Sequence, residues 1–472
     1  MAIIKTRVET HVKTNVLKIS KLVKGIIISF CAVLVIYLGL SIYFSNHFYF
    51  GTKINGISVS GKTVEAADEA IASSVETYTL ELTERGDVKE QIQASDIGLK
   101  YNAEGKTQVL KDSQNSFGWV FALFKKEDSQ MNDIVSYDED LLKGVFNKLS
   151  CLDSNKVIEP KNATLEYKDK VYGISEEVSG NKIKKDILYD NVVNAILKDE
   201  KTINLEAINS YEVPKYTKDS QEVIDAKDTL NKYLTTKITY SIDGASEFLD
   251  GDTIHKWLGV DEDFAVIINE NKIENYVDTL GSKYNTAGKT RDFVTTLKTS
   301  TKVSGGNYGW IIDRYGEVQD IIASIKDGQV ITKEPKYSST TISHNTNDIG
   351  NTYVEINFTK QHLWFYKNGA LVVEGDVVTG NVSKGTATPT GVYVLNNREK
   401  NSTLKGEDYA VPVGFWMPFN QGIGIHDAIW RTEFGKTIYL TDGSHGCINA
   451  PYELAKTIYE NIQVGTPIVC YY

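Results

Sequence analysis

The stretch SHGCIN at residues 444–449 contains one of only four cysteines in a chain of 472 residues. A cysteine thiolate is a strong nucleophile, and His445 stands two positions before Cys447. Gly446 allows unusual backbone angles and close approach of a substrate, so the N–H groups of Gly446 and Cys447 are expected to point at a developing oxyanion. The stretch therefore predicts a sulfur nucleophile together with a site that stabilises negative charge.

A general base must accompany the sulfur, and histidine is the usual one. Of the seven histidines, His362 alternates with aromatic residues in a strand-like run and is expected to be structural. His426 follows a short Gly-Ile alternation typical of a strand end, whereas His445 shares the loop with Cys447. The spacing of these residues leaves both His426 and His445 open as the base.

Two elements are expected to position this loop. The run KTIYLTDG at 436–443 predicts a strand, and PYELAKTIYENI at 451–462 predicts a helix with Pro451 in its first turn and Gly465 soon after its end. A loop at such a junction lies near the helix N-terminus, where the helix dipole favours negative charge. We therefore expect the pKa of the Cys447 thiol to lie below its usual value of about 8.5.

The residues around the loop indicate a β-rich domain over residues 350–472. Asn368-Gly369 is a two-residue hairpin turn in a region of alternating apolar residues. Strands are predicted at 353–358, 361–380, 388–395 and 466–472. With the helix at 451–462, the C-terminal region is expected to be mainly β with one clear helix.

An internal duplication precedes this domain. VSGNKIKKDILYDNVVNAILK at 178–198 resembles VSGGNYGWIIDRYGEVQDIIASIK at 303–326, and each is followed by Pro-Lys-Tyr, at 214–216 and 335–337. Short β-like runs such as 78–84 alternate with helical patterns such as 140–149. The sequence therefore predicts two α+β modules, at residues 51–216 and 217–340.

The N-terminal region indicates a membrane anchor. Residues 1–24 carry a net charge of +5, which leaves −16 for the rest of a chain whose total is −11. The nineteen residues from Ile26 to Phe44 have no charge, a length that spans a bilayer core of about 30 Å. A cleaved signal peptide is the alternative, but its apolar region is usually shorter. We expect a cytoplasmic tail at 1–24, a transmembrane helix at 25–45 and an extracellular remainder. The acidic remainder disfavours nucleic-acid binding.

The segment IHDAIWRTEFGKTIYLTDGSHGCINAP at 425–451 resembles the signature of the L,D-transpeptidase catalytic domain, with an upstream histidine, a gap, and then Ser-His-Gly-Cys. The resemblance extends from about Tyr353 to the C-terminus and includes TPTGVY and GFWMPFN. The duplicated region resembles the peptidoglycan-binding modules that precede this domain in some Gram-positive members. The resemblance implies a β-sandwich catalytic domain with a short helix after the cysteine loop, two α+β modules and an N-terminal transmembrane helix.

The resemblance also implies a reaction on peptidoglycan. In the family, the cysteine at the position of Cys447 attacks the third residue of a tetrapeptide stem, releases the terminal D-Ala and forms a thioester. The amine of a neighbouring stem then takes the acyl group and gives a 3→3 cross-link. His426 would be the base and the Asp427 carbonyl would orient it. By the same resemblance, His445 and Gly446 shape the site and the oxyanion pocket, and Ser444 supports them. Asn449 braces the turn and is expected to contact the substrate.

No cofactor or metal is expected, and carbapenems are expected to acylate Cys447. Three alternatives stay open at this point. Water as acceptor would make the protein an L,D-carboxypeptidase, since acceptor choice depends on pocket shape. A zinc hydrolase would use His426, His445 and Cys447 as ligands. A non-catalytic wall-binding protein would carry a degenerate domain. Whichever activity holds, the two modules either contact glycan strands or stems or serve only as spacers. Cys151 and Cys470 are expected to be core thiols.

Overall fold

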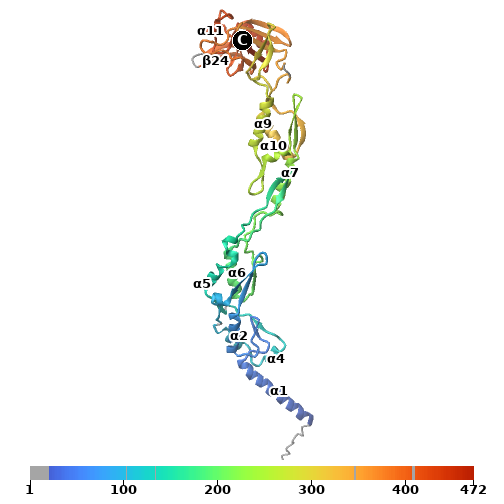
Figure 1. Cartoon of the computed structure of the whole chain (residues 1–472), viewed down its shortest axis with the longest axis vertical. Coiled ribbons are helices and arrows are strands. Elements are labelled where there is room, and N and C mark those ends of the chain that lie inside the picture. The colour runs from blue at the N-terminus through green and yellow to red at the C-terminus, as the bar shows by residue number, and fades with distance from the viewer. Residues whose placement is uncertain (1–20, 103, 133, 345–346, 407–409) are drawn as a thin grey trace, which may run out of the picture. The chain divides into compact units, whose positions relative to one another are not determined.

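The computed structural model describes residues 21–102, 104–132, 134–344, 347–406 and 410–472 (Figure 1). These residues form two compact units. The first contains the chain up to Ala163 together with Glu176–Thr217, and the second contains Thr164–Ser175 together with Lys218–Tyr472. Residues 1–20 of the expected basic tail lie outside the described part of the chain.

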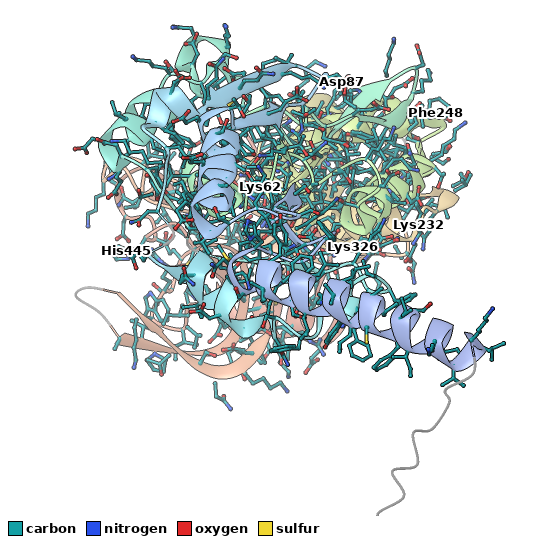
Figure 2. All side chains as sticks on the ribbon, turned by 90° about the horizontal axis from the view of Figure 1, so that it is seen from below. Lys62, Asp87, Lys232, Phe248, Lys326 and His445 are labelled. Carbon is teal, nitrogen blue, oxygen red and sulfur yellow. The ribbon has the colours of Figure 1, made fainter. Side chains whose placement is uncertain are left out.

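The first unit opens with the apolar helix α1 (Lys21–Asn46), whose side chains stand out from the ribbon along most of its length (Figure 2). Its length and composition are sufficient to cross a membrane. Near its C-terminal end, Ser41 and Phe44 are buried, and Phe48, two residues past the helix, already belongs to the core of the unit. The apolar helix therefore runs directly into the first module.

Both modules contain a three-stranded sheet packed against helices. The strand order is β10–β3–β4 in the first unit and β18–β11–β12 in the second, and the first strand of each sheet is parallel to the middle one. These strands are β3 (Thr79–Thr83), β4 (Lys89–Gln93), β10 (Thr202–Asn204), β11 (Lys237–Ile242), β12 (Ala245–Leu249) and β18 (Val330–Lys333). The two modules thus share one sheet topology.

The main helices of the two modules occupy matching places along the chain: one helix precedes the first two strands of the sheet, and two helices lie between those strands and the last one. In the first unit they are α2 (Val64–Glu76), α5 (Glu139–Phe146) and α6 (Lys185–Leu197), and in the second α7 (Gln221–Leu234), α9 (Glu270–Tyr284) and α10 (Arg314–Asp327). Helices α9 and α10 lie side by side (Figure 1). The predicted strand at 78–84 and helix at 140–149 are confirmed as β3 and α5.

One hairpin packs away from its sequence neighbours. Strands β8 (Thr164–Lys168) and β9 (Val171–Ser175) belong to the second unit, although the chain on both sides of them belongs to the first. The Tyr172 N–H donates to the Asn231 side chain on α7 over 2.8 Å, and the Tyr172 hydroxyl donates to the His255 carbonyl over 3.1 Å. Because these contacts hold the hairpin on α7, the expected first module at 51–216 is not one continuous unit.

The C-terminal domain is β-rich, as expected, and consists of two sheets. The first has the order β22–β21–β20–β28–β23 and the second β24–β25–β26–β27. Their bounds are β20 (Tyr353–Asn357), β21 (His362–Lys367), β22 (Ala370–Asp376), β23 (Gly391–Val394), β24 (Glu399–Lys405), β25 (Ala410–Asn420), β26 (Ile423–Asp427), β27 (Ile448–Ala450) and β28 (Pro467–Tyr471). Buried side chains of both sheets, such as Ile356 and Met417, share one core.

Several local predictions in this domain are confirmed. Asn368 and Gly369 have φ of 51° and 80° and join β21 to β22, as a type I′ hairpin turn requires. The predicted helix is α12 (Tyr452–Asn461), with Pro451 immediately before it. Leu454, Ala455 and Ile458 of α12 are buried in the core shared by the two sheets.

The predicted strand at 436–443 is wrong. Its centre forms a single helical turn, α11 (Ile438–Thr441), and no residue of that turn is fully buried. The carbonyls of Tyr439 and Leu440 accept hydrogen bonds from the N–H groups of Val382 and Ser383. This run lies at the edge of the domain, where tertiary contacts with the 382–383 loop outweigh the β preference of its residues.

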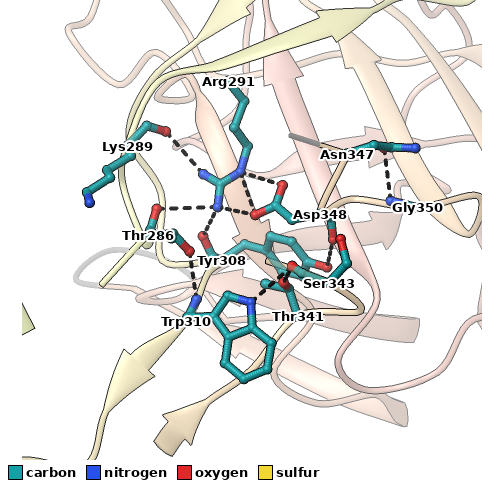
Figure 3. Close-up of polar contacts among 10 residues, drawn as sticks. All are labelled: Thr286, Lys289, Arg291, Tyr308, Trp310, Thr341, Ser343, Asn347, Asp348 and Gly350. Carbon is teal, nitrogen blue, oxygen red and sulfur yellow. Dashed lines mark hydrogen bonds and ion pairs between the residues drawn. The ribbon is translucent and has the colours of Figure 1, made fainter. Parts of the chain in front are cut away.

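A buried ion pair fixes the connection between the second module and the C-terminal domain (Figure 3). Arg291, at the start of β15 (Arg291–Val294), lies 2.7 Å from Asp348 and also donates to backbone carbonyls, including that of Tyr308. The Tyr308 hydroxyl donates to the Asp348 carbonyl over 2.7 Å. Further along, Thr296 donates to the fully buried carboxylate of Glu355 on β20. The hairpin of β15 and β16 (Ser300–Val303) is therefore packed as part of the C-terminal domain.

Candidate active site

Strands β26 and β27 bring the predicted site residues together. They pair in parallel with Ile425 opposite Ile448 and His426 opposite Asn449. Both isoleucines are fully buried in the core. Because side chains alternate along a strand, His426 and Asn449 face the opposite side, as does Cys447, which immediately precedes Ile448. These three side chains line one cavity of about 410 Å³.

His426 is held in one orientation. It is 3% exposed, and its Nδ1 lies 2.9 Å from the backbone carbonyl of Asp427. A carbonyl can only accept, so Nδ1 carries the proton and Nε2 keeps its lone pair. Burial lowers the pKa of His426, which favours the neutral imidazole. The ring stacks with Trp430 at a centroid distance of 5.8 Å. This is the state that a general base requires.

The pKa of the Cys447 thiol is shifted in the direction opposite to the one expected. Burial raises the pKa of its thiol, while a hydrogen bond from the Gly424 backbone acts in the opposite direction. The sulfur lies 3.6 Å from the Gly422 carbonyl, to which the thiol donates. Strand β27 stands between Cys447 and α12, so the sulfur is not at a helix N-terminus. The predicted lowering of the thiol pKa by the helix dipole is therefore wrong, and the resting residue is a thiol.

The turn before the sulfur is internally braced. The Ser444 hydroxyl donates to the Cys447 carbonyl over 2.5 Å and accepts the Gly446 N–H over 3.0 Å. The Gly446 carbonyl accepts from the Thr388 hydroxyl over 2.7 Å, and Gly446 has φ of 122°, which an L-residue rarely adopts. Since the Gly446 N–H is engaged by Ser444, the expectation that it points at an oxyanion is wrong. Of the two expected donors, only the Cys447 N–H remains.

His445, Asn449 and Asp427 complete the set of predicted residues. His445 is exposed and lines the same cavity as His426. Asn449 is 3% exposed, and its side-chain oxygen is buried with no hydrogen-bond partner among the described residues. The Asp427 carboxylate accepts the Phe415 N–H over 2.8 Å, so it braces β25 against β26 while its carbonyl holds His426.

Sequence reasoning missed several residues of the cavity. They are Lys384, Leu404, Val411, Trp430, Arg431 and Asp442. The Arg431 guanidinium lies 3.1 Å from the Asp442 carboxylate, and its Nε is buried with no partner among the described residues. Trp430 and Arg431 follow His426 by four and five positions, inside the segment that carries the family resemblance. An uncommon Trp-Arg pair so close to a candidate base was the available signal.

The remaining cysteines are unpaired and lie elsewhere. Cys470 is fully buried on β28, and burial raises the pKa of its thiol, as expected of a core residue. Cys151 is only partly buried, and its pKa is raised to about 12 by burial and by Glu84 and Glu90. The side chains of Glu84, Glu90 and Cys151 form a group of potential metal-binding residues outside the cavity. His362 contacts Asp376 at 2.6 Å and has a structural role, as expected.

A β-rich domain of two sheets with a cysteine and a histidine lining one cavity is an arrangement that cysteine enzymes of acyl transfer and hydrolysis use. Comparison with known families is more specific. The L,D-transpeptidase catalytic domain (YkuD) matches residues 351–470. The domain described as "Putative peptidoglycan binding domain" matches twice, at 90–204 and 216–332. No match was found among the curated proteins.

The sequences of several solved proteins also match this chain. The chain is 34% identical to a cysteine-to-serine mutant of an Enterococcus faecium L,D-transpeptidase, over 52% of this chain and 98% of that one, with a TM-score of 0.40. The Ldtfm–avibactam carbamoyl enzyme is 33% identical over 53% and 99%, also with a TM-score of 0.40. The catalytic domain of the E. faecium L,D-transpeptidase acylated by ertapenem is 41% identical over 26% and 97%, with a TM-score of 0.24. On these sequence matches, the chain belongs to the L,D-transpeptidase family.

Proposed function

We propose that this L,D-transpeptidase forms 3→3 peptidoglycan cross-links through a thioester on Cys447. The observation that carries the proposal is the pairing of β26 with β27. It brings Cys447 into one cavity with a buried, neutral His426 whose Nδ1 is bonded to the Asp427 carbonyl. A neutral base beside a neutral thiol is the starting state for acyl transfer to sulfur.

The reaction follows from this starting state. Nε2 of His426 takes the thiol proton as the sulfur attacks the carbonyl of the third stem residue. The resulting oxyanion faces the Cys447 N–H, and the intermediate collapses when His426 returns the proton to the departing D-Ala amine. An acceptor amine then loses a proton to His426 and attacks the thioester. The products are a new amide bond and the regenerated thiol.

Other cavity residues have roles in binding. The unpartnered Asn449 oxygen is suited to accept an N–H of the stem backbone. Arg431 and Lys384 provide positive charge in the cavity for the carboxylates of the stem. Ser444 and Asp427 position the nucleophile and the base and need no contact with substrate.

The location of the substrate agrees with the expected topology. We propose that α1 anchors the chain in the cell membrane, with residues 1–24 in the cytoplasm and the rest at the cell wall. Peptidoglycan lies outside the membrane, where no ATP is available. A thioester conserves the energy of the cleaved peptide bond, so the formation of the new amide bond needs no ATP. The two module matches further support contact with the wall.

β-Lactams are expected to react with the same sulfur. The relatives described above include an avibactam carbamoyl enzyme and an ertapenem acyl-enzyme. We propose that a carbapenem acylates Cys447 by the same proton transfer to His426. The raised pKa of the thiol means that His426 activates the sulfur for this reaction too.

The test is turnover of a disaccharide-tetrapeptide by the full-length protein, followed by mass spectrometry, with wild type beside Cys447→Ala. A dimeric product with loss of D-Ala, absent in the variant, is the expected result. Tripeptide without dimer would establish an L,D-carboxypeptidase with water as acceptor. Turnover by Cys447→Ala, or no turnover by wild type, would refute the proposal.

A further inference from the structure

An uncharged aromatic segment in the first unit is exposed where its composition predicts burial. The twelve residues SQNSFGWVFALF at 113–124 contain no charge. Helix α4 (Trp119–Ala122) forms its centre. The exposed fractions are 55% for Phe117, 79% for Phe121, 57% for Leu123 and 88% for Phe124. Contiguous large apolar side chains of this kind mark a contact surface.

The segment is packed against the C-terminal half of α1. The Tyr37 hydroxyl donates to the Phe117 carbonyl over 2.8 Å, and the Tyr37 ring lies 5.9 Å from the ring of Trp119. The Phe44 ring lies 6.0 Å from that of Trp119, and Phe44 is fully buried. The segment is therefore fixed at the level of Tyr37 to Phe44 on the apolar helix.

The length of α1 determines what surrounds this level. From Lys24 to Tyr37 the helix rises about 20 Å at ~1.5 Å per residue, which is too short for a hydrocarbon core of about 30 Å. The core is spanned only when the helix is counted to Phe44, roughly 10 Å beyond Tyr37. The segment at 113–124, whose Phe117 carbonyl is bonded to Tyr37, then lies within the outer part of the bilayer.

The segment is chemically suited to that depth. Part of its backbone is paired internally, with N–H groups of Gly118, Phe121 and Phe124 donating to the carbonyls of Asn115, Gly118 and Phe121. Internal pairing is what a backbone next to acyl chains requires. Exposed Lys125 and Lys126 follow directly and can reach lipid phosphates. Exposed aromatic and apolar side chains next to basic residues are typical of segments that contact the membrane interface.

We infer that residues 117–124 insert into the outer leaflet beside α1 and make a second membrane contact for the protein. The partner is the acyl-chain and glycerol region of the bilayer, and the insertion fixes the first module at the membrane surface. The inference rests on the proposed role of α1 as a retained anchor. It goes beyond that role, since a simple anchor needs no contact between a module and lipid.

The test is photocrosslinking to lipid in the full-length protein, reconstituted into vesicles of phosphatidylethanolamine and phosphatidylglycerol. Benzoylphenylalanine replaces Phe121 or Phe124, changes that keep an aromatic ring at an exposed position. Ile36 on α1, 60% exposed, is the positive control, and Ile158 in the same unit, 57% exposed, is the negative control. Thermal unfolding by circular dichroism verifies that each variant is folded.

The expected result is lipid adducts at positions 36, 121 and 124, with at least tenfold less at 158. Adducts at 36 without adducts at 121 and 124 would overturn the inference and leave the anchor intact. No adduct at 36 would overturn both the anchor and the inference. Crosslinks from 121 to protein instead of lipid would show that the surface docks a polypeptide, which also overturns the inference.

Discussion

Nδ1 of His426 lies 2.9 Å from the backbone carbonyl of Asp427, the next residue in the chain. This bond is made by the strand itself, because β26 ends at Asp427 and its pairing with β25 and β27 fixes both residues. The orientation of the His426 ring therefore depends on sheet pairing and needs no separate side-chain partner. The same pairing sets the position of Cys447.

We predict that His426→Gln lowers the rate of Cys447 acylation by ertapenem about 10²–10⁴-fold, the usual contribution of a general base. His445→Gln is the matched control, because His445 lines the same cavity but is exposed. It is expected to have a smaller effect. Stopped-flow fluorescence gives both rates. A larger loss in His445→Gln would assign the base to His445.

The pH dependence of kcat/KM follows from the two shifted groups. Burial holds the pKa of His426 below its ordinary value and that of Cys447 above its ordinary value. As the pH falls, His426 keeps its lone pair until the pH passes below its lowered pKa. Activity should therefore persist below pH ~6.5, the ordinary histidine value. Rates of D-Ala release across the acidic and neutral range measure this. An acidic limb centred above that value would contradict the neutral-base state.

Ser444→Ala should loosen the turn that carries the sulfur. The substitution removes the bond to the Cys447 carbonyl and leaves the Gly446 N–H without its acceptor, a loss of about 1–3 kcal/mol per unsatisfied group. We expect kcat to fall about tenfold or more with little change in KM. Ser402→Ala on β24, whose hydroxyl contacts Glu399, is the control. Unchanged kcat in Ser444→Ala would refute the bracing role.

Arg431→Met should weaken binding of the donor stem. Hydrogen bonds to charged groups contribute about 1.5–3 kcal/mol, so KM for a stem with a free carboxylate should rise roughly tenfold or more. A stem whose carboxylates are amidated should show a smaller change. Arg398→Met is the control, because Arg398 donates to the carbonyls of Tyr459 and Ile462 instead. Equal effects on both stems would exclude carboxylate recognition by Arg431.

Thr296→Val should destabilise the catalytic domain although Thr296 lies outside it in sequence. Its hydroxyl donates over 2.6 Å to Glu355, which is fully buried and also accepts from Tyr471. Removing a partner from a buried carboxylate costs about 1–3 kcal/mol. Denaturant unfolding should detect the loss, with Thr301→Val on β16 as control. Equal stability of the two variants would mean that the hairpin is not part of the domain.

The sequence predicted the elements that depend on local pattern. The Asn368-Gly369 turn and α12 carry their own turn and helix signals, and both are present. Residues 436–443 have a β-like pattern but pair with no strand among the described residues, and their tertiary contacts accompany the helical turn α11 at their centre. Burial raises the pKa of the Cys447 thiol, and β27, a three-residue strand too short to show a pattern, separates Cys447 from the N-terminus of α12. The placement of the β8–β9 hairpin needed contacts that no local pattern contains.

The candidate site was predictable as far as its motif reached. Cys447, His426 and Asn449 line one cavity, as their family positions implied. Arg431 was missed because its significance lies in a buried Nε without a partner among the described residues, which only the folded environment creates. The engagement of the Gly446 N–H by Ser444 likewise depends on the three-dimensional turn.

The detour of the β8–β9 hairpin has a consequence for the covalent connection of the molecule. The chain passes between the two units three times, at 163–164, 175–176 and 217–218. A protease that cuts any one of these crossings leaves the other two intact, so at least one of the two fragments keeps a segment packed in each unit. After a single nick the C-terminal domain therefore stays attached to the first unit through a packed segment, whereas in a protein with one linker the same cut would separate the two units.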